Sequence, residues 1–483
     1  MENKLQKRYG LFTAICMVVG IVIGSGVFFK GQNVLAHTNG NVMLGVLAWA
    51  IGGAVMVICA YTFAKLSTKF VKVNGIVDYS EAMVGKKYAY AMGWFVSTIY
   101  YPAMTSVLGW VSARYTLELF GVNPGDAATS ALTLTLGAFY LILAYALNIL
   151  APKIAGKFQV GTTVIKMVPL ILMAVVGIIY GLVKGNTQDA FTNSFNSDSS
   201  AGFIGVLGAV CAAAFAYEGW IIATTINAEL KEPKKHLPIA LVFGTIIIVI
   251  VYIVYFLGVT GGADVNTLIT QGSTAAFTNI FGKIAGKILI AFIVVSCWGT
   301  LNGLMLACTR AIYSVSVRKN GPKPEVFGEL SKSTNMPTNS GVFALVVCGF
   351  WFFYFFAANL NSKPLFGVFS FDSSELPIIT IYGMYLPIFI MFIIKEVKAK
   401  NIKGAIAPVL AIIASVFMMF AAVYAHGVKP YQDAKAAGEF SCPILFYLIV
   451  FVVIMAIGII FYRKQNGVSA EEKAYAEESE TEF

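Results

Sequence analysis

Residues 21–29 read IVIGSGVFF, which places three consecutive small residues, Gly24, Ser25 and Gly26, inside the first long apolar run of the chain. Within membrane hydrocarbon every backbone N–H and C=O group must find a partner inside the protein. Irregular backbone therefore survives only where it lines a cavity or is buried. We interpret Gly24–Gly26 as a candidate break in a membrane helix. The alternative is that Gly20 and Gly24 form a GxxxG surface against which another helix packs.

The composition is that of a membrane protein. The chain has 483 residues, of which 58% are hydrophobic and 12% are charged, and its mean hydropathy is +0.77. Soluble domains carry about 25% charged residues. The net charge of +10 comes largely from basic residues in short loops between apolar runs. We therefore expect a lipid bilayer around the chain and no nucleic acid partner.

The apolar runs predict an all-α polytopic membrane protein with 12 transmembrane helices. The predicted spans are 11–36, 42–66, 88–118, 129–150, 157–183, 202–229, 237–260, 284–317, 340–358, 375–395, 404–426 and 443–462.

The basic residues predict the orientation. With the N-terminus inside, 25 of the 34 Lys and Arg residues lie at the inner ends of spans or in inner loops. The outer loops 121–130 and 185–200 contain none, as expected for the non-cytoplasmic side. We expect a multi-pass protein of the cell (plasma) membrane with both termini cytoplasmic. Residues 1–10 form the cytoplasmic N-terminus, and the acidic tail at 464–483 is expected to be disordered.

A second interruption lies in the sixth span. There Phe215-Ala216-Tyr217-Glu218-Gly219-Trp220 places a carboxylate and a glycine in the middle of an apolar run. Interruptions at corresponding places in two halves indicate inverted repeats with a substrate site at the midplane. The repeats are predicted at 11–200 (spans one to five) and 201–400 (spans six to ten), with 401–463 appended. Freed N–H groups attract an anion and freed C=O groups a cation, so a zwitterionic amino acid fits both.

Four stretches resemble the amino acid-polyamine-organocation (APC) superfamily, and within it the bacterial relatives of L-amino-acid transporters. They are VVGIVIGSGVF (18–28), AFAYEGWIIATTINAELKEPKKHLPIAL (214–241), SCWGTLNGLMLACTRAIYSVSVRKNGPKP (296–324) and NMPTNSGVFAL (335–345).

The resemblance implies a leucine-transporter-type 5+5 inverted repeat, with helices 1 and 6 broken, that moves amino acids by alternating access. It implies that the backbone amides of Gly24, Ser25 and Gly26 hold the substrate carboxylate. The other substrate-binding positions that it implies are carbonyl groups near Ile23, Phe215 and Ala216 for the amino group, and Tyr217, Gly219 and Trp220 for selectivity.

Glu218 departs from the resemblance, because close relatives commonly have Asp at this position. It is either a structural partner for a neighbouring hydroxyl or backbone N–H, or a contact for a cationic substrate. The second reading keeps an amine or polyamine substrate open.

Lys166 lies about ten residues from each end of the fifth span, where an ammonium group is costly and marks function. In sodium-independent members of the superfamily, a fifth-span lysine takes the place of a cation and contacts the first break. The resemblance therefore implies a coupling role for Lys166. The alternatives are a proton-coupling role and a side chain that reaches the membrane surface.

Three further residues are candidates for gating. Glu229 could pair with Arg310 or Arg318 at the inner end of the bundle, although a solvated helix end is as plausible for Glu229. Asn302, with Gly303, could face the site from the eighth span or could pack between helices.

No cofactor, metal or enzymatic activity is expected. The seven cysteines are scattered without a CxxC pair, and His37, His236 and His426 have no partner at metal or catalytic spacing. The leading function is therefore secondary transport of α-amino acids, as a permease or exchanger. The resemblance at Lys166 implies that transport is independent of sodium, and protons are the other possible coupling partner. The alternatives are a proton-coupled amine or polyamine transporter and, in another class, a non-transporting amino acid sensor.

Overall fold

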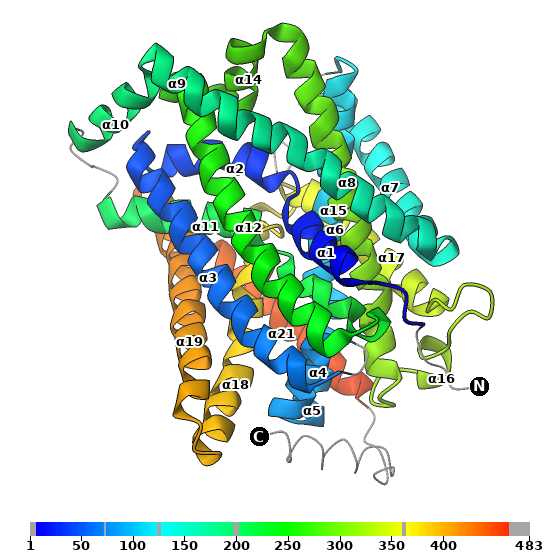
Figure 1. Ribbon diagram of the computed structural model, residues 1–483. Helices are drawn as coiled ribbons and strands as arrows, with labels where there is room; N and C mark the ends of the chain where they lie inside the picture. Colours follow the sequence, from blue (N-terminus) through cyan, green and yellow to red (C-terminus); the bar gives the residue numbers. More distant parts are fainter. Residues whose placement is uncertain (1–5, 72–73, 123–126, 197–201, 360–363, 463–483) are drawn as a thin grey trace.

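The structure is a computed structural model of the whole chain. It describes all residues except 1–5, 72–73, 123–126, 197–201, 360–363 and 463–483 (Figure 1). The described residues form a helical bundle, and their one strand-like contact is an isolated bridge between Tyr9 and Leu230. The predicted acidic tail and the predicted boundary between the two repeats lie outside the described residues.

Ten helical segments of the described chain are long and apolar enough to cross a membrane. They are Val42–Lys69 (α3), Ser130–Leu150 (in α7), Pro152–Lys184 (α8, η2 and α9), Ile204–Glu229 (α11 and η3), Pro233–Gly262 (α12), Lys283–Ser316 (α15), Thr338–Asn359 (α17), Leu376–Lys398 (α18), Ile402–Ala436 (α19, η5 and α20) and Pro443–Phe461 (α21).

The other two predicted spans are also helical. One is divided into α1 (Leu11–Val22) and α2 (Gly26–His37). The other runs through α5 (Lys86–Phe95), the π-helical turn η1 (Val96–Tyr100) and α6 (Tyr101–Leu119). The all-α membrane fold is confirmed, whereas the count of twelve spans stays a prediction.

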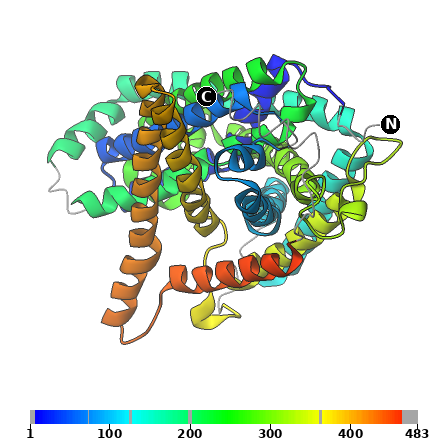
Figure 2. The same ribbon diagram turned by 90° about the horizontal axis from the view of Figure 1, so that it is seen from below.

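Burial separates the centre of the bundle from its outside. In the Ile204–Glu229 segment, 94% of the most apolar window is buried, against 22% for α21. Figure 2 shows α21, in red-orange, along the outside of the bundle. A segment buried on all sides can hold an interruption, because its freed backbone groups meet protein instead of lipid.

Short helices complete the bundle ends. They are α4 (Gly75–Met83), α10 (Asn186–Asn196), α13 (Val265–Gln271), α14 (Ser273–Phe281) and α16 (Pro324–Phe327). We call the end at which Tyr9 lies the N-terminal end. There the backbone N–H of Tyr9 donates to the Glu229 carbonyl (3.0 Å).

Candidate functional site

The first helix is broken where the small residues predict it. α1 ends at Val22 and α2 begins at Gly26, with Ile23 already outside the helical region at φ −72° and ψ 84°. The N–H groups in the first turn of α2 have no acceptor within their own helix. They therefore form the electropositive side of a break in the centre of the protein.

The sixth span is broken at Glu218 and Gly219. α11 (Gly202–Tyr217) ends there and a 3₁₀ helix, η3 (Trp220–Glu229), continues. Gly219 has a φ of +106°, a backbone conformation that residues other than glycine rarely adopt. A Cβ atom at Gly219 would also lie 2.9 Å from Ile21 Cγ2. The glycine is thus required both by the turn and by the contact with the first span.

The two breaks meet each other. A Cβ atom built at Gly26 would lie 2.8 Å from the Ala216 Cα atom. The Tyr252 hydroxyl of α12 lies 3.0 Å from the Val22 carbonyl oxygen and 3.1 Å from that of Ala216. Tyr252 therefore links the last turns of α1 and α11, a role that its place in an apolar run did not indicate.

A small cavity of about 20 Å³ lies between the breaks. Its lining residues are Ile21, Val22, Gly24, Ser25, Gly26, Met104, Leu108, Phe215, Ala216, Glu218, Gly219, Thr300 and Leu304.

Seven of the ten residues predicted to bind substrate line this cavity. The other three, Ile23, Tyr217 and Trp220, are not among its lining residues. The Tyr217 ring packs against Trp49 and Tyr252, and Trp220 packs against Phe63. Ile23 takes part through its carbonyl oxygen, which accepts a hydrogen bond from Lys166 (2.6 Å).

Four lining residues lie on predicted spans but were not themselves predicted to line the site. Met104 and Leu108 lie on α6, and Thr300 and Leu304 lie on α15. Positions 104 and 108, like 300 and 304, are four residues apart and share one helix face. The spacing of four residues is visible in the sequence, but the sequence does not show which face of either helix is turned toward the site.

Asn302 lies on the opposite face of α15. Its side-chain amide donates to Gln159 Oε1 (3.0 Å) and to the Ala155 carbonyl (3.2 Å), and its Oδ1 accepts from Asn148 (3.1 Å). These contacts join α15 to α7 and α8. The structure therefore places Asn302 between packed helices, which was the alternative to its proposed place at the site.

Lys166 is fully buried against the first break. Its ammonium group donates to the carbonyl oxygens of Gly20 (2.8 Å) and Ile23 (2.6 Å). The Ser296 carbonyl (3.2 Å) and the Thr300 hydroxyl (3.3 Å) complete the set of oxygen neighbours. Oxygen atoms of α1, of Ile23 just after it and of α15 therefore surround a single positive charge that α8 carries.

Glu218 is buried and accepts a hydrogen bond from the Tyr100 hydroxyl. Tyr100 is the last residue of the π-helical turn η1. Pro102, two residues further along, has no N–H group to donate to the Thr98 carbonyl. That carbonyl instead accepts from Trp351 Nε1 (2.7 Å). The interrupted helix thus carries the tyrosine that holds Glu218.

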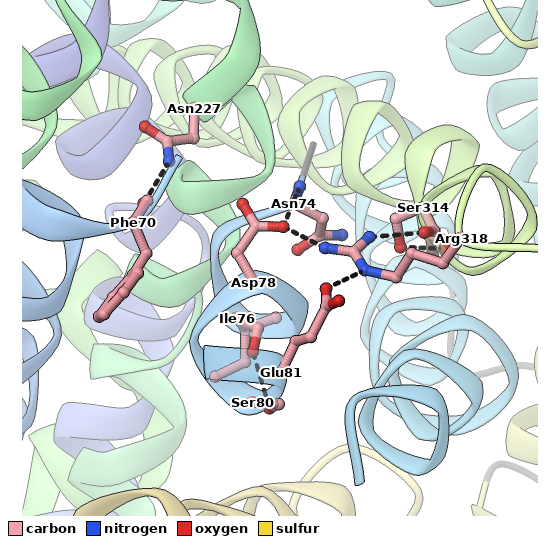
Figure 3. A network of polar contacts seen from close by, with 10 residues as sticks. Phe70, Asn74, Ile76, Asp78, Ser80, Glu81, Asn227, Ser314 and Arg318 are labelled. Carbon is pink, nitrogen blue, oxygen red and sulfur yellow. Dashed lines mark hydrogen bonds and ion pairs between the residues drawn. The ribbon is translucent and has the colours of Figure 1, made fainter. Parts of the chain in front are cut away.

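Buried ion pairs close the N-terminal end. Arg310 of α15 contacts Glu229 through Nε (2.6 Å) and Nη2 (2.5 Å), and both side chains are fully buried. Arg318, just after α15, contacts Asp78 and Glu81 of α4, the latter at 2.9 Å. Figure 3 shows its guanidinium group between the two carboxylates. Of the two arginines proposed as partners of Glu229, Arg310 forms the ion pair in the structure.

A different ionic cluster closes the opposite end. Lys30 of α2 contacts Glu375, at the start of α18. His426 Nε2 lies 3.1 Å from the second oxygen of the same carboxylate. The Lys30 ammonium also lies 4.6 Å from the centre of the Phe215 ring. The sequence did not indicate this contact of His426, because residues 375 and 426 meet only in the folded chain.

Two broken helices around a central cavity, in a membrane-spanning bundle, define a secondary transporter. The family model described as amino acid permease matches residues 9–456, and the chain belongs to this family.

Comparisons with individual proteins agree with the family. The serine/threonine exchanger SteT of Bacillus subtilis is 31% identical over 86% of this chain and 91% of its own. The mouse b(0,+)-type amino acid transporter 1 is 26% identical, over 89% of this chain and 85% of its own. The crystal structure of MhsT in complex with L-phenylalanine shares the fold, with a TM-score of 0.60 at 14% identity, covering 87% of this chain and 99% of that one. The leucine-transporter-type fold and the predicted function, amino acid transport, are thereby confirmed.

Proposed function

We propose that this transporter exchanges small neutral α-amino acids across the plasma membrane without sodium. The observation that carries the proposal is the meeting of two helix breaks at one cavity. The first turn of α2, the electropositive end of that helix, lies opposite the carbonyl end of α11. A carboxylate suits the former and an ammonium group the latter. The amides of Gly24–Gly26 are assigned to the carboxylate.

Lys166 supports the sodium independence. Its ammonium group already lies among oxygen atoms of Gly20, Ile23, Ser296 and Thr300, a set of ligands that would otherwise suit a metal cation. A fixed positive charge there holds α1, α8 and α15 together without a transported ion.

The lining of the cavity supports a small substrate side chain. Met104, Leu108 and Leu304 present apolar surface, and the open volume is about 20 Å³ in this conformation. Large side chains would require all three to move. The SteT relative is a serine/threonine exchanger, and both of these amino acids are small and neutral.

The proposed orientation places both termini in the cytoplasm, so the N-terminal end of the bundle is the inner end. The inner gate is then formed by the ion pairs Arg310–Glu229 and Arg318–Asp78. The outer gate is formed by Lys30, Glu375 and His426, which we call the Lys30 cluster. The repeats are assigned to residues 11–200 and 201–400. The chain acts as a carrier and not as an enzyme.

The test is counterflow in proteoliposomes loaded with one amino acid, with a panel of labelled amino acids outside. Serine-sized neutral amino acids should exchange at the same rate with sodium or with potassium in the buffer. Stimulation by sodium contradicts the ion-independent part of the proposal. Stimulation by an inward proton gradient, with no dependence on internal amino acid, favours proton symport instead.

Replacing the buried lysine should abolish exchange. Lys166→Ala leaves the oxygen atoms around Nζ without their donor, each loss costing about 1–3 kcal/mol, and we expect uptake to fall about 100-fold. The matched control is Lys184→Ala, at the exposed end of the same span, which should exchange normally. Equal exchange by both variants, at equal amounts of inserted protein, would refute the role of Lys166.

A second candidate substrate is an amine. Glu218 lines the cavity and keeps one carboxylate next to it. Glu218→Gln should leave the exchange of neutral amino acids within about threefold if Tyr100 is its main partner, because a neutral hydrogen bond replaces a charged one. Loss of amine uptake alone in this variant would instead support the amine assignment.

A further inference from the structure

A groove on the outside of the bundle is lined by two stripes of matching spacing. One stripe belongs to α5 and the other to α21 and the residue after it. They comprise Lys87, Tyr90, Ala91 and Trp94, and Met455, Gly458, Ile459 and Tyr462. Each follows the i, i+3, i+4, i+7 pattern that places residues on one helix face. The volume between them is about 380 Å³, within the range of about 300–1,000 Å³ of small-molecule sites.

Two polar side chains in the walls of the groove are already paired. The Tyr90 hydroxyl donates to the Gly458 carbonyl (2.5 Å), and Trp94 Nε1 donates to the Ile454 carbonyl (2.9 Å). A Cβ atom at position 458 would lie 2.5 Å from Trp94 Cδ1, so glycine permits this close approach. With these two groups paired, the surface between Trp94 and Ile459 is mainly apolar, and Lys87 supplies a charge at the beginning of α5. The groove therefore suits hydrocarbon.

The position of the groove indicates where that hydrocarbon comes from. α21 is the least buried of the ten described spans, and Ile459 is 74% exposed on it. The exposed Lys87 stands at the beginning of α5, next to Tyr90 and Trp94. Tyr and Trp gather at the boundary between hydrocarbon and headgroups, and basic pockets between membrane helices bind anionic headgroups.

We propose that this groove binds one anionic glycerophospholipid. The Lys87 ammonium pairs with its phosphate, and one acyl chain lies between Trp94 and Ile459. The proposal depends on neither the substrate nor the coupling ion of the transporter, because the groove lies apart from the central cavity.

Native mass spectrometry of the full chain tests the headgroup contact. The protein is released from detergent with phosphatidylglycerol or phosphatidylcholine of identical acyl chains, and the retained lipid is counted. The wild type should retain phosphatidylglycerol preferentially. Lys87→Gln should lower that preference about fivefold, the effect of one basic residue near an anionic surface. Lys153→Gln, which removes an exposed lysine at the start of α8, should leave it unchanged.

A second variant tests the acyl-chain contact separately. Ala91→Phe fills the groove and keeps Lys87, so retention of both lipids should fall. The proposal is overturned if the wild type shows no preference, if Lys87→Gln behaves as Lys153→Gln does, or if a second copy of the chain displaces the lipid in the spectrum. It is equally overturned if Glu477→Gln, Glu478→Gln and Glu480→Gln together raise lipid retention severalfold, since the acidic tail would then be the occupant.

Discussion

The two ends of the bundle are closed by ionic contacts of different construction. At the N-terminal end, Arg310 and Arg318 each have their own carboxylate partners, Glu229 for the first and Asp78 with Glu81 for the second. At the opposite end a single carboxylate, Glu375, serves both Lys30 and His426.

This difference has two physical consequences. Opening the N-terminal end requires two separate sets of ion pairs to break, and arginine stays charged at any physiological pH. The opposite end depends on one carboxylate, and one of its two cations is a histidine that can lose its charge near neutral pH. The opposite end should therefore open more easily and, in the proposed orientation, respond to the medium outside.

The largest effect should follow from breaking the N-terminal end at Arg310. Arg310→Met leaves Glu229 charged and fully buried without its partner, and the free energy of unfolding should fall by about 3–5 kcal/mol. Thermal unfolding in detergent measures it. The paired variant Arg310→Met with Glu229→Leu should recover most of the stability, because well-packed apolar residues often replace a buried ion pair without loss. A single variant as stable as the wild type would contradict the buried-pair argument.

An intermediate effect should follow from removing Glu375. Glu375→Gln leaves Lys30 without its carboxylate, so the opposite end should spend more time open. Cys211 lines the same small pocket as Glu375 and His426 and reports this opening. Its labelling by a membrane-impermeant maleimide should become about tenfold faster, as expected for the loss of a mostly buried ion pair. Cys211→Ala in the same background identifies the labelled site, and an unchanged rate would mean that Glu375 does not hold this end closed.

The smallest effect should come from His426. Protonated imidazole adds a second cation beside Glu375, so acid outside should stabilise the closed form of that end. We expect Cys211 labelling to be about twofold slower in an acidic than in an alkaline medium, because a protonated imidazole adds the second cation. His426→Gln should abolish the difference. A pH effect of equal size in the variant would assign it to another group, such as the nearby His37.

The sequence predicted the central part of the molecule well. The helices are interrupted within IVIGSGVFF and within FAYEGW, as predicted. Gly-Ser-Gly and Glu-Gly are unusual inside an apolar run, so both places could be recognised from the sequence. Lys166 could be selected for the same reason: a charge that far from both ends of a span must find partners inside the protein.

Other parts of the site could not be predicted. The sequence left open whether Asn302 faces the cavity or packs between helices, and it did not indicate Thr300 and Leu304, because the rotation of α15 about its axis is fixed by its contacts with α6 and α8. The Lys30 cluster combines positions 30, 375 and 426. In a single sequence, nothing marks such distant residues as neighbours.

The sequence by itself determined the class of fold, the places of the two breaks and the buried charge of Lys166. These follow from local rules, since a membrane penalises every unpaired backbone group and every isolated charge wherever it occurs. Only the tertiary structure decided which helix faces line the cavity, that Tyr252 links both breaks, and that the two ends close by unlike ion pairs. Those features depend on the rotation and packing of whole helices, which no local pattern specifies.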